Sequence, residues 1–224
     1  GAVDIGIRAL GAGTRALCRM GCGERIDWIG PLGRGFLLPP RSNQGTSDDA
    51  DRPDRPLLLA VGGGIGIFPL LGLLEEARAR GMGTLSVLGF RDPSQAFLLR
   101  EFREISDRSL FASDTGGLDH HGNAVEAVRQ LLSDPSVRQA VGKGGLRMAA
   151  CGPHPMMKAV ARLAEDLGIP CQVSLEQRMG CGTGVCLVCA CEVRRKNPEG
   201  GPATDYVRCC REGPVFDARE VVWE

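Results

Sequence analysis

Four cysteines near the C-terminus have the spacing of a metal-cluster site. Cys181, Cys186 and Cys189 form a C-x4-C-x2-C pattern, and Cys209 and Cys210 follow about twenty residues later. This is the spacing with which plant-type ferredoxins hold a 2Fe–2S cluster, whereas zinc sites more often show two C-x2-C pairs. The intervening glycines suit a loop that wraps a cluster closely and aims backbone N–H groups at its sulfurs. The sequence therefore predicts a 2Fe–2S cluster rather than four unrelated thiols, and leaves Cys209 or Cys210 open as the fourth ligand.

A second candidate site is a glycine-rich turn at 61–69, VGGGIGIFP. Glycines allow a pyrophosphate to approach the backbone, and the following helix offers free N–H groups and a positive dipole end. Ile67 stands where the third glycine of a strict G-x-G-x-x-G would be, so the turn departs from the usual dinucleotide fingerprint. The alternative is a tight connection that binds nothing.

A third segment, 151–157 (CGPHPMM), lies where a later strand ends and the next helix begins. Ligands of open α/β sheets bind at that edge, so we expect this segment beside the glycine turn. Taken alone, Cys151 is equally well explained as a small buried side chain, and His154 as a surface residue.

The elements that position these segments follow from apolar patterning. Continuous apolar runs predict buried strands at 57–61, 84–90, 109–112, 146–151 and 171–175. Helical spacing predicts helices at 69–80, at 124–132 and from about 155 to Gly168. This alternation predicts a doubly wound α/β sheet. Short β segments are expected at 3–10, 14–20 and 25–29, and a linker at 41–56.

Composition excludes several function classes. Lys plus Arg and Asp plus Glu both total 27, and aromatic residues make up 4% of the 224 residues. A neutral, aromatic-poor chain argues against a nucleic-acid binder and against binding to anionic membranes. No apolar run reaches the roughly 18 residues of a membrane span, and no signal peptide is expected at Gly1. Ten cysteines without a secretory signal then indicate a reducing, cytoplasmic compartment.

These motifs, in this order, resemble one family across nearly the whole chain. It is the electron-transfer subunit of NAD-dependent (class 1B) dihydroorotate dehydrogenase, within the ferredoxin–NAD(P) reductase superfamily. The segments that carry the resemblance are GAGT at 11–14, GPLGRGF at 30–36, VGGGIG at 61–66, CGPHPMMKAV at 151–160, SLEQRMGCGTGVCLVC at 174–189 and CREGPVFDAREV at 210–221.

The resemblance implies an oxidoreductase subunit with a ferredoxin reductase-like fold. It would divide into a partial N-terminal antiparallel FAD-binding β-barrel (1–40), the linker (41–56), an NAD-binding α/β domain (57–173) and a small 2Fe–2S domain (174–224). In pyrimidine biosynthesis, it would pass electrons from the FMN of a separate dihydroorotate dehydrogenase catalytic subunit through 2Fe–2S and FAD to NAD+. The implied partner is that FMN-containing subunit, in a heterotetramer, with neither nucleic acid nor membrane involved.

The resemblance also assigns site residues, while it gives no catalytic residue. The cluster ligands would be Cys181, Cys186, Cys189 and Cys210. The other two sets are Gly6, Ile7, Arg8, Gly13 and Thr14 for FAD, and Gly62, Gly63, Gly64, Gly66, Cys151 and Gly152 for NAD, with the last two beside the nicotinamide.

The chain departs from the family pattern at its N-terminus. The family barrel begins some sixty residues earlier and carries an Arg-Pro-x-Ser type flavin motif that is not found here. We therefore expect either a truncated product or an incomplete FAD domain, and weak FAD binding. The segment between Cys189 and Cys210 is also longer than expected, and 194–205 suggests an inserted hairpin tip.

Two alternative functions stay open. One is an electron-transfer subunit of another NAD(P)H-dependent flavin and iron–sulfur oxidoreductase, although Cys181 stands where that group often has an aspartate. The other is a flavin-less, ferredoxin-like redox carrier. The pair Arg91-Asp92 after the second strand offers one cation and one carboxylate, so it does not decide between NAD and NADP.

Overall fold

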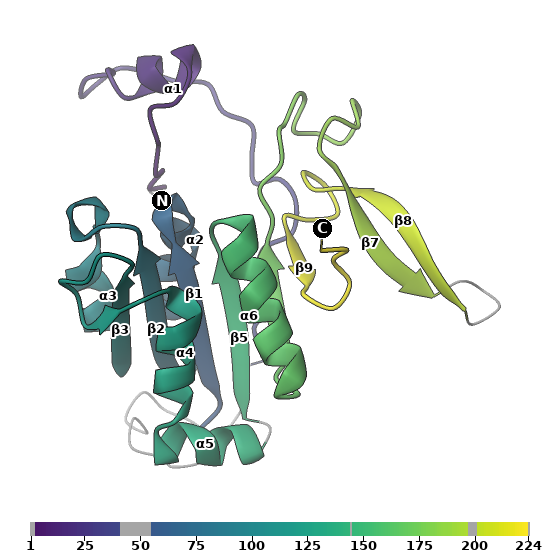
Figure 1. The fold of residues 1–224 in the computed structure, drawn as a ribbon. Coiled ribbons are helices and arrows are strands. Elements are labelled where there is room, and N and C mark those ends of the chain that lie inside the picture. Colours follow the sequence, from purple (N-terminus) through teal and green to yellow (C-terminus); the bar gives the residue numbers. More distant parts are fainter. Residues whose placement is uncertain (1–2, 41–54, 144, 197–200, 224) are drawn as a thin grey trace.

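The computed structural model describes residues 3–40, 55–143, 145–196 and 201–223. Its main body is a seven-stranded sheet with strand order β4-β3-β2-β1-β5-β6-β9, all parallel except for β9 (Figure 1). The strands are β1 (Leu57–Gly63), β2 (Gly83–Phe90), β3 (Arg108–Ser113), β4 (His120–His121), β5 (Leu146–Cys151), β6 (Cys171–Ser174) and β9 (Val215–Asp217). Most of the linker predicted at 41–56 lies outside the described residues.

Helices cover both faces of this sheet, as expected of a doubly wound fold. They are α2 (Phe68–Ala79), α3 (Leu99–Ile105), α4 (Ala124–Leu132), α5 (Pro135–Gly142) and α6 (His154–Asp166). Alternate side chains of β1 enter two separate cores: Leu59 and Val61 belong to the core with α4 and α6, and Leu58 and Ala60 to the core with α2 and α3. The predicted strands and helices of this region are confirmed, and α3 and α5 were not predicted.

The order of the strands creates a switch point between β1 and β5. The chain runs from β1 outward through β2, β3 and β4, then crosses back to β5 on the other side of β1. Loops that leave β1 and β5 therefore diverge to opposite faces, and this opens a crevice at the carboxyl ends of the strands. Both predicted ligand-binding segments, the glycine turn and the 151–157 segment, begin at this crevice.

The expected N-terminal β-barrel is wrong for the part of the chain that the structure describes. Residues 3–40 contain no strand, and the segment predicted as a strand at 14–20 overlaps the helix α1 (Ala12–Leu17). The Oγ1 atom of Thr14 accepts hydrogen bonds from the N–H groups of Leu10 and Gly11, each at 3.0 Å, and this capping favours a helical turn. Without neighbouring strands to pair with, the alternating apolar side chains Val3, Ile5 and Ile7 stay exposed.

The C-terminal region forms a hairpin and returns one strand to the main sheet. The strands β7 (Ala190–Lys196) and β8 (Pro202–Arg208) pair antiparallel, and the hairpin extends beyond the sheet edge that β9 forms (Figure 1). A hairpin was expected here from the long segment between Cys189 and Cys210. The strand β9 pairs antiparallel with β6, and this fixes the cluster-loop region against the α/β body.

The GPLGRGF segment packs against this C-terminal region. The N–H of Arg34 donates to the carbonyl of Gly213 at 2.5 Å, and the N–H of Val215 donates back to Arg34 at 3.3 Å. Farther on, the Gln172 side chain bonds both the N–H and the carbonyl of Leu37, at 2.9 and 2.8 Å. Residues 34–37 therefore tie the N-terminal region to the edge of the sheet.

Candidate dinucleotide pocket and iron–sulfur site

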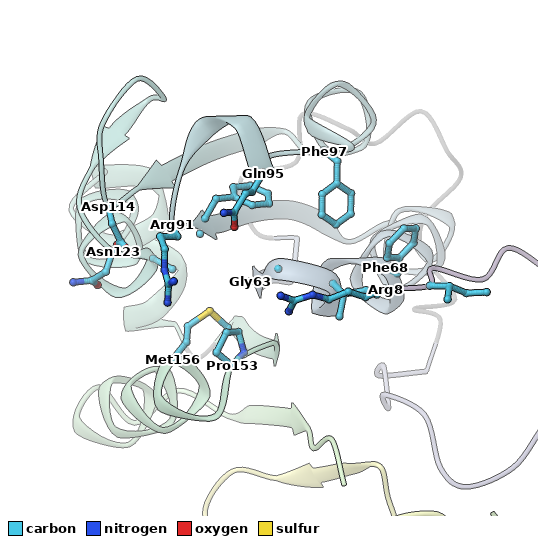
Figure 2. A pocket seen from close by; sticks show the side chains of 16 residues that line it. Arg8, Gly63, Phe68, Arg91, Gln95, Phe97, Asp114, Asn123, Pro153 and Met156 are labelled. Carbon is cyan, nitrogen blue, oxygen red and sulfur yellow. The ribbon is translucent and has the colours of Figure 1, made fainter. Parts of the chain in front are cut away.

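A pocket of about 860 Å³ lies at the carboxyl ends of β1, β2 and β3 (Figure 2). The N-terminal segment closes one side of it, and the glycine turn and the start of α6 form its floor. A volume of this size suits a nucleotide-sized ligand. The lining residues are Ile7, Arg8, Gly63, Gly64, Ile65, Phe68, Gly89, Phe90, Arg91, Gln95, Phe97, Asp114, Asn123, Ala124, Pro153 and Met156.

The glycine turn and the 151–157 segment touch each other, as the sequence predicts. A Cβ atom on Gly66 would lie 2.6 Å from the backbone nitrogen of Gly152 and 2.7 Å from the carbonyl oxygen of Cys151. Only glycine permits this approach, because real Cβ atoms do not come so close to backbone atoms. The contact holds the turn against the end of β5, where a dinucleotide would lie across both.

The four predicted glycines divide between the pocket and the core. Gly63 and Gly64 line the pocket. Gly62 is buried within β1, where an added Cβ would meet the side chains of Ile67 and Leu70 at 2.8 and 3.0 Å. Gly62 and Gly66 make packing contacts. Gly63 lines the pocket but also packs against Met156 and Pro153, and only Gly64 has open space beside it.

The charges in the pocket come from different parts of the chain. The guanidinium groups of Arg8 and Arg91 approach the pocket from opposite sides, and Asp114 adds one carboxylate (Figure 2). Asp92 does not line the pocket. Its carboxylate accepts hydrogen bonds from the N–H of Ser94 at 2.8 Å and from the hydroxyl of Thr115 at 3.2 Å, and the Ser94 bonds lower the pKa of Asp92. Of the pair Arg91-Asp92, therefore, only Arg91 faces the pocket.

Cys151 is a partly buried thiol at the end of β5, packed against the core that α2 and α3 form. Burial raises its pKa to about 11, which leaves almost no thiolate at neutral pH. The backbone of Gly152 next to it has a φ of +151° and packs on Gly63, and Gly152 lines a second cavity of about 800 Å³ between α6 and the hairpin. The expected nicotinamide contact of Cys151 and Gly152 stays a prediction.

The residues predicted for FAD lie in different surroundings. Ile7 and Arg8 line the pocket, and Gly6 packs on the ring of Phe68. Gly13 has open space around it, and Thr14 caps α1. The structure brings the first three to the pocket and leaves Gly13 and Thr14 on the short helix above it.

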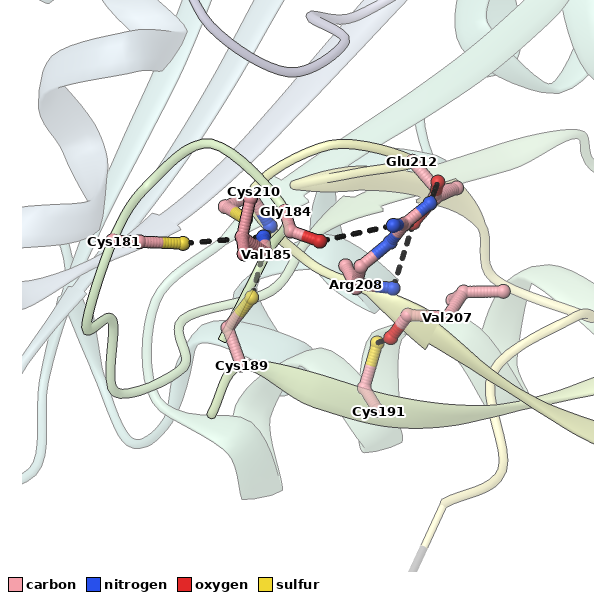
Figure 3. Close-up of polar contacts among 9 residues, drawn as sticks. All are labelled: Cys181, Gly184, Val185, Cys189, Cys191, Val207, Arg208, Cys210 and Glu212. Carbon is pink, nitrogen blue, oxygen red and sulfur yellow. Dashed lines mark hydrogen bonds and ion pairs between the residues drawn. The ribbon is translucent and has the colours of Figure 1, made fainter. Parts of the chain in front are cut away.

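The cluster loop directs backbone donors at Cys181, of which Figure 3 shows the N–H of Val185. The Sγ of Cys181 accepts hydrogen bonds from the N–H groups of Thr183 and Val185, at 3.4 and 3.3 Å. Hydrogen bonds from the Thr183 side chain and then from the backbone of Cys186, Val185 and Thr183 lower the pKa of Cys181 to about 5, so the thiolate is favoured. Positive φ angles at Gly182, Gly184 and Leu187 (+71°, +87° and +59°) turn the loop back on itself to direct these donors inward.

Cys189 and Cys210 meet on the other side of the loop. The N–H of Cys210 donates to the Sγ of Cys189 at 3.4 Å, and this bond lowers the pKa of the Cys189 thiol. The contact with Cys189 in turn raises the pKa of Cys210. Cys186 is exposed on the same loop, with its Sγ beside Gly180. Cys189 and Cys210, two of the candidate ligands, are therefore in direct contact.

Cys209 points away from this group. It is fully buried, its Sγ donates to the carbonyl of Leu175 at 3.4 Å, and burial raises its pKa to about 12. Cys191 is likewise turned inward, toward the carbonyl of Val207 at 3.6 Å. Of the two adjacent cysteines, therefore, only Cys210 has its thiol beside another candidate ligand.

The donor set fits a 2Fe–2S cluster better than a single metal ion. Within the described ranges, no three His, Cys, Asp or Glu side chains are arranged to hold one ion. A 2Fe–2S cluster spreads four thiolates over two irons, so its ligands need not converge on one point. Cysteines on a glycine-rich loop with N–H groups directed at sulfur match that requirement.

Comparison with known proteins agrees with this site. A family model described as the iron–sulfur cluster binding domain of dihydroorotate dehydrogenase B matches residues 176–222. A protein of Geobacillus thermodenitrificans named dihydroorotate dehydrogenase B (NAD(+)), electron transfer subunit, is 37% identical over 215 residues, or 96% of this chain and 72% of the relative. The protein of the same name in Fusobacterium nucleatum is 31% identical and covers 98% and 74% of the two chains. This chain belongs to that family of electron transfer subunits.

Solved structures support the same fold. The NADH-dependent reduced ferredoxin-NADP oxidoreductase superposes with a TM-score of 0.70 at 27% identity, over 97% of this chain and 67% of that one. The cytochrome b5 reductase domain of Ulva prolifera nitrate reductase superposes with a TM-score of 0.52 at 15% identity and shows the fold alone. The predicted ferredoxin reductase-like α/β class with a C-terminal iron–sulfur domain is confirmed. Among the described helices, none has the length and apolarity needed to cross a bilayer.

Several pocket residues of this electron transfer subunit were missed by sequence reasoning. Asp114 follows β3 directly and Asn123 lies two residues after β4, so the rule that ligands bind at carboxyl strand ends could have identified them. Phe68 and Phe97 lie with their ring centroids 5.5 Å apart beside the pocket, and no sequence pattern indicated that pair.

Proposed function

We propose that this chain connects NAD+ to the FMN of a dihydroorotate dehydrogenase catalytic subunit through FAD and a 2Fe–2S cluster, in pyrimidine biosynthesis. The observation that carries the proposal is the presence, in one chain of this family, of a nucleotide-sized pocket and a three-cysteine loop with Cys210 beside it. The cluster would accept single electrons and the nicotinamide a hydride, while a flavin can exchange either.

The chain's own residues would bind and orient these groups. Gly63 and Gly64 line the pocket where the NAD pyrophosphate would bind, and Gly66, packed on Gly152, fixes the turn. Arg8 offers a cation where the N-terminal segment meets the pocket, as FAD phosphates would require. Gly62, Cys151 and Gly152 would complete the NAD set, and Gly6, Ile7, Gly13 and Thr14 the FAD set.

The ligands would be Cys181, Cys186 and Cys189 on the cluster loop and Cys210 after β8. The N–H donors at Cys181 and Cys189 favour the thiolate forms that bind iron, and the contact of the Cys209 thiol with the Leu175 carbonyl supports Cys210 over Cys209 as the fourth ligand. The chain would divide as the sequence suggests, with FAD contacts before residue 41, NAD contacts at 57–173 and the cluster domain from 174.

The catalytic subunit would dock beside the cluster loop. Val185, Leu187 and Val188 belong to this loop, and each exposes more than half of its side chain, at 80%, 61% and 57%. Apolar side chains gathered beside a redox centre suit a protein partner, because the electron must cross the contact. The FMN-containing subunit is the occupant we propose, and the assembly would be a heterotetramer.

The proposal is tested by reconstitution with that catalytic subunit. Dihydroorotate added to the complex should reduce NAD+, and Cys186→Ser should abolish NAD+ reduction while the catalytic subunit still reduces an artificial dye directly. Leu37 has an exposed side chain and does not line the pocket, so Leu37→Ala is a control that should keep full activity. NAD+ reduction that survives Cys186→Ser would contradict the proposal.

A further inference from the structure

We propose that Arg208 is a positioning residue for the iron–sulfur site, acting through the peptide group that joins Gly184 to Val185. This inference rests on the proposed function, since it assumes a cluster bound at Cys181. Arg208 lies at the end of β8, outside the cysteine motif, and no ligand pattern in the sequence includes it.

The geometry joins Arg208 to a cluster ligand through one peptide. The Nη1 atom of Arg208 donates to the carbonyl oxygen of Gly184 at 2.9 Å. The N–H of that same peptide, on Val185, donates to the Sγ of Cys181 at 3.3 Å (Figure 3). A cation at the carbonyl end both fixes the direction of the peptide and polarises it, and thereby strengthens the N–H···S bond.

Glu212 holds the guanidinium in place. Its Oε2 accepts a hydrogen bond from the Arg208 Nε at 3.0 Å and from the Arg208 N–H at 2.8 Å, and its Oε1 bonds the Nη2 atom. These three contacts fix the guanidinium group against the carboxylate and leave its Nη1 atom directed at Gly184. Arginine can make this two-pronged contact and still reach Gly184, whereas lysine has a single ammonium group.

The cluster loop does not by itself fix the orientation of the peptide between Gly184 and Val185. Gly184 has a φ of +87°, and the adjoining Val185 side chain is 80% exposed, so packing of Val185 does not fix the peptide between them. Glycine tolerates either direction of the neighbouring peptide at low cost. With the Arg208 contact, the N–H of Val185 faces Cys181. With the peptide reversed, the carbonyl oxygen would face the sulfur instead.

The expected consequence is a shift in the reduction potential of the cluster. Reduction adds negative charge to the sulfurs, and an N–H donor stabilises that charge. Loss of the Val185 donor should therefore lower the midpoint potential. We expect a roughly tenfold change in the equilibrium constant for reduction, which is about 59 mV for a one-electron couple.

Two variants separate positioning from simple charge. Arg208→Lys keeps the positive charge but loses the guanidinium donors that bond Glu212 and Gly184 at the same time. Glu212→Gln removes a negative charge near the cluster. If Arg208 acts only by its charge, Arg208→Lys leaves the potential unchanged and Glu212→Gln raises it. If Arg208 positions the peptide, both variants lower it. Arg195→Gln is the matched control, since Arg195 pairs with Glu220 at 3.1 Å on the same hairpin, outside the cluster loop.

The experiment is an EPR-monitored redox titration of the full chain and its variants, with the urea midpoint measured to check folding. We expect a lower midpoint potential of the cluster for Arg208→Lys and for Glu212→Gln. The midpoint potential of Arg195→Gln should equal that of the wild type. An unchanged potential in Arg208→Lys, or a higher one in Glu212→Gln, overturns the inference. A folded Arg208→Lys that loses its cluster to a chelator several-fold faster than the control supports it. A wild-type chain without a cluster would instead contradict the proposed function.

Discussion

Cys209 and Cys210 are neighbours in sequence, yet their thiols lie in different environments. Successive residues of an extended segment point to opposite sides, so one thiol enters the core and the other reaches the loop. Cys209 donates to the buried carbonyl of Leu175, while the backbone of Cys210 bonds the sulfur of Cys189. The chemistry available to each cysteine is therefore set by the direction of its side chain.

Replacing these two cysteines in turn should give opposite results. Cys210→Ser should lose or strongly destabilise the cluster, because serine is a poor substitute for a thiolate ligand. Cys209→Ser should keep the visible and EPR spectra nearly unchanged, at some cost in stability, since the site is buried. Spectra of the two purified variants decide the matter. Cluster loss in Cys209→Ser alone would reassign the fourth ligand.

Two glycines of the nucleotide region offer a matched pair for a stability test. Gly66→Ala should lower the free energy of unfolding by about 1–3 kcal/mol, because its Cβ would overlap the backbone of Gly152. It should also weaken NADH binding by displacing the turn. Gly72→Ala, at an exposed and uncrowded position of α2, should raise stability by about 0.5–1 kcal/mol. Urea denaturation of the two variants gives their free energies of unfolding. If Gly66→Ala changes stability in the same way as Gly72→Ala, the close contact at Gly66 does not matter for stability.

At the scale of elements, apolar runs predicted the α/β body well. The spacing of apolar residues is distinctive in buried strands such as β1 and β5 and in amphipathic helices such as α4. The helix α5 was missed although Asp134 and Pro135 form a usual helix start. The helix α3 follows Leu98 in a left-handed conformation, which nothing in its sequence indicates.

The N-terminal region was predicted wrongly for a physical reason. Alternating residues such as Val3, Ile5 and Ile7 suit a strand, but a strand forms only where a neighbour supplies hydrogen bonds and an apolar face. Among residues 3–40 no such neighbour exists, so local capping by Thr14 determines the structure. The site was predictable where one chain segment carries it, as in the cysteine loop, and not where distant segments meet, as at Arg8 and Asp114.

This view predicts uneven protection from hydrogen exchange. Amides of residues 3–32 should exchange fast, because their side chains are exposed and the only helix described there, α1, buries no residue. Amides of β1 and β5 in the centre of the sheet should exchange slowest. Hydrogen exchange measured by mass spectrometry on the isolated chain compares the amides of residues 3–32 with those of β1 and β5. Protection of 3–10 equal to that of β1 would mean that a sheet forms there.

At the scale of the whole molecule, the sheet connects the two candidate sites. The pocket lies at the carboxyl ends of β1 to β3, and the cluster loop leaves the same end of β6 (Figure 1). β9 and residues 34–37 tie the cluster region to the sheet edge. This arrangement places the pocket and the cysteine loop at the same edge of one sheet.

The most direct test of this account is the metal content of the purified chain. Anaerobically purified protein should contain about two irons per chain and, once reduced, give the rhombic EPR signal of one 2Fe–2S cluster. Both should disappear in Cys210→Ser and persist in Cys209→Ser. One zinc per chain with neither iron nor an EPR signal would contradict the assignment of the cysteine loop, and with it the proposed route of electrons to NAD+.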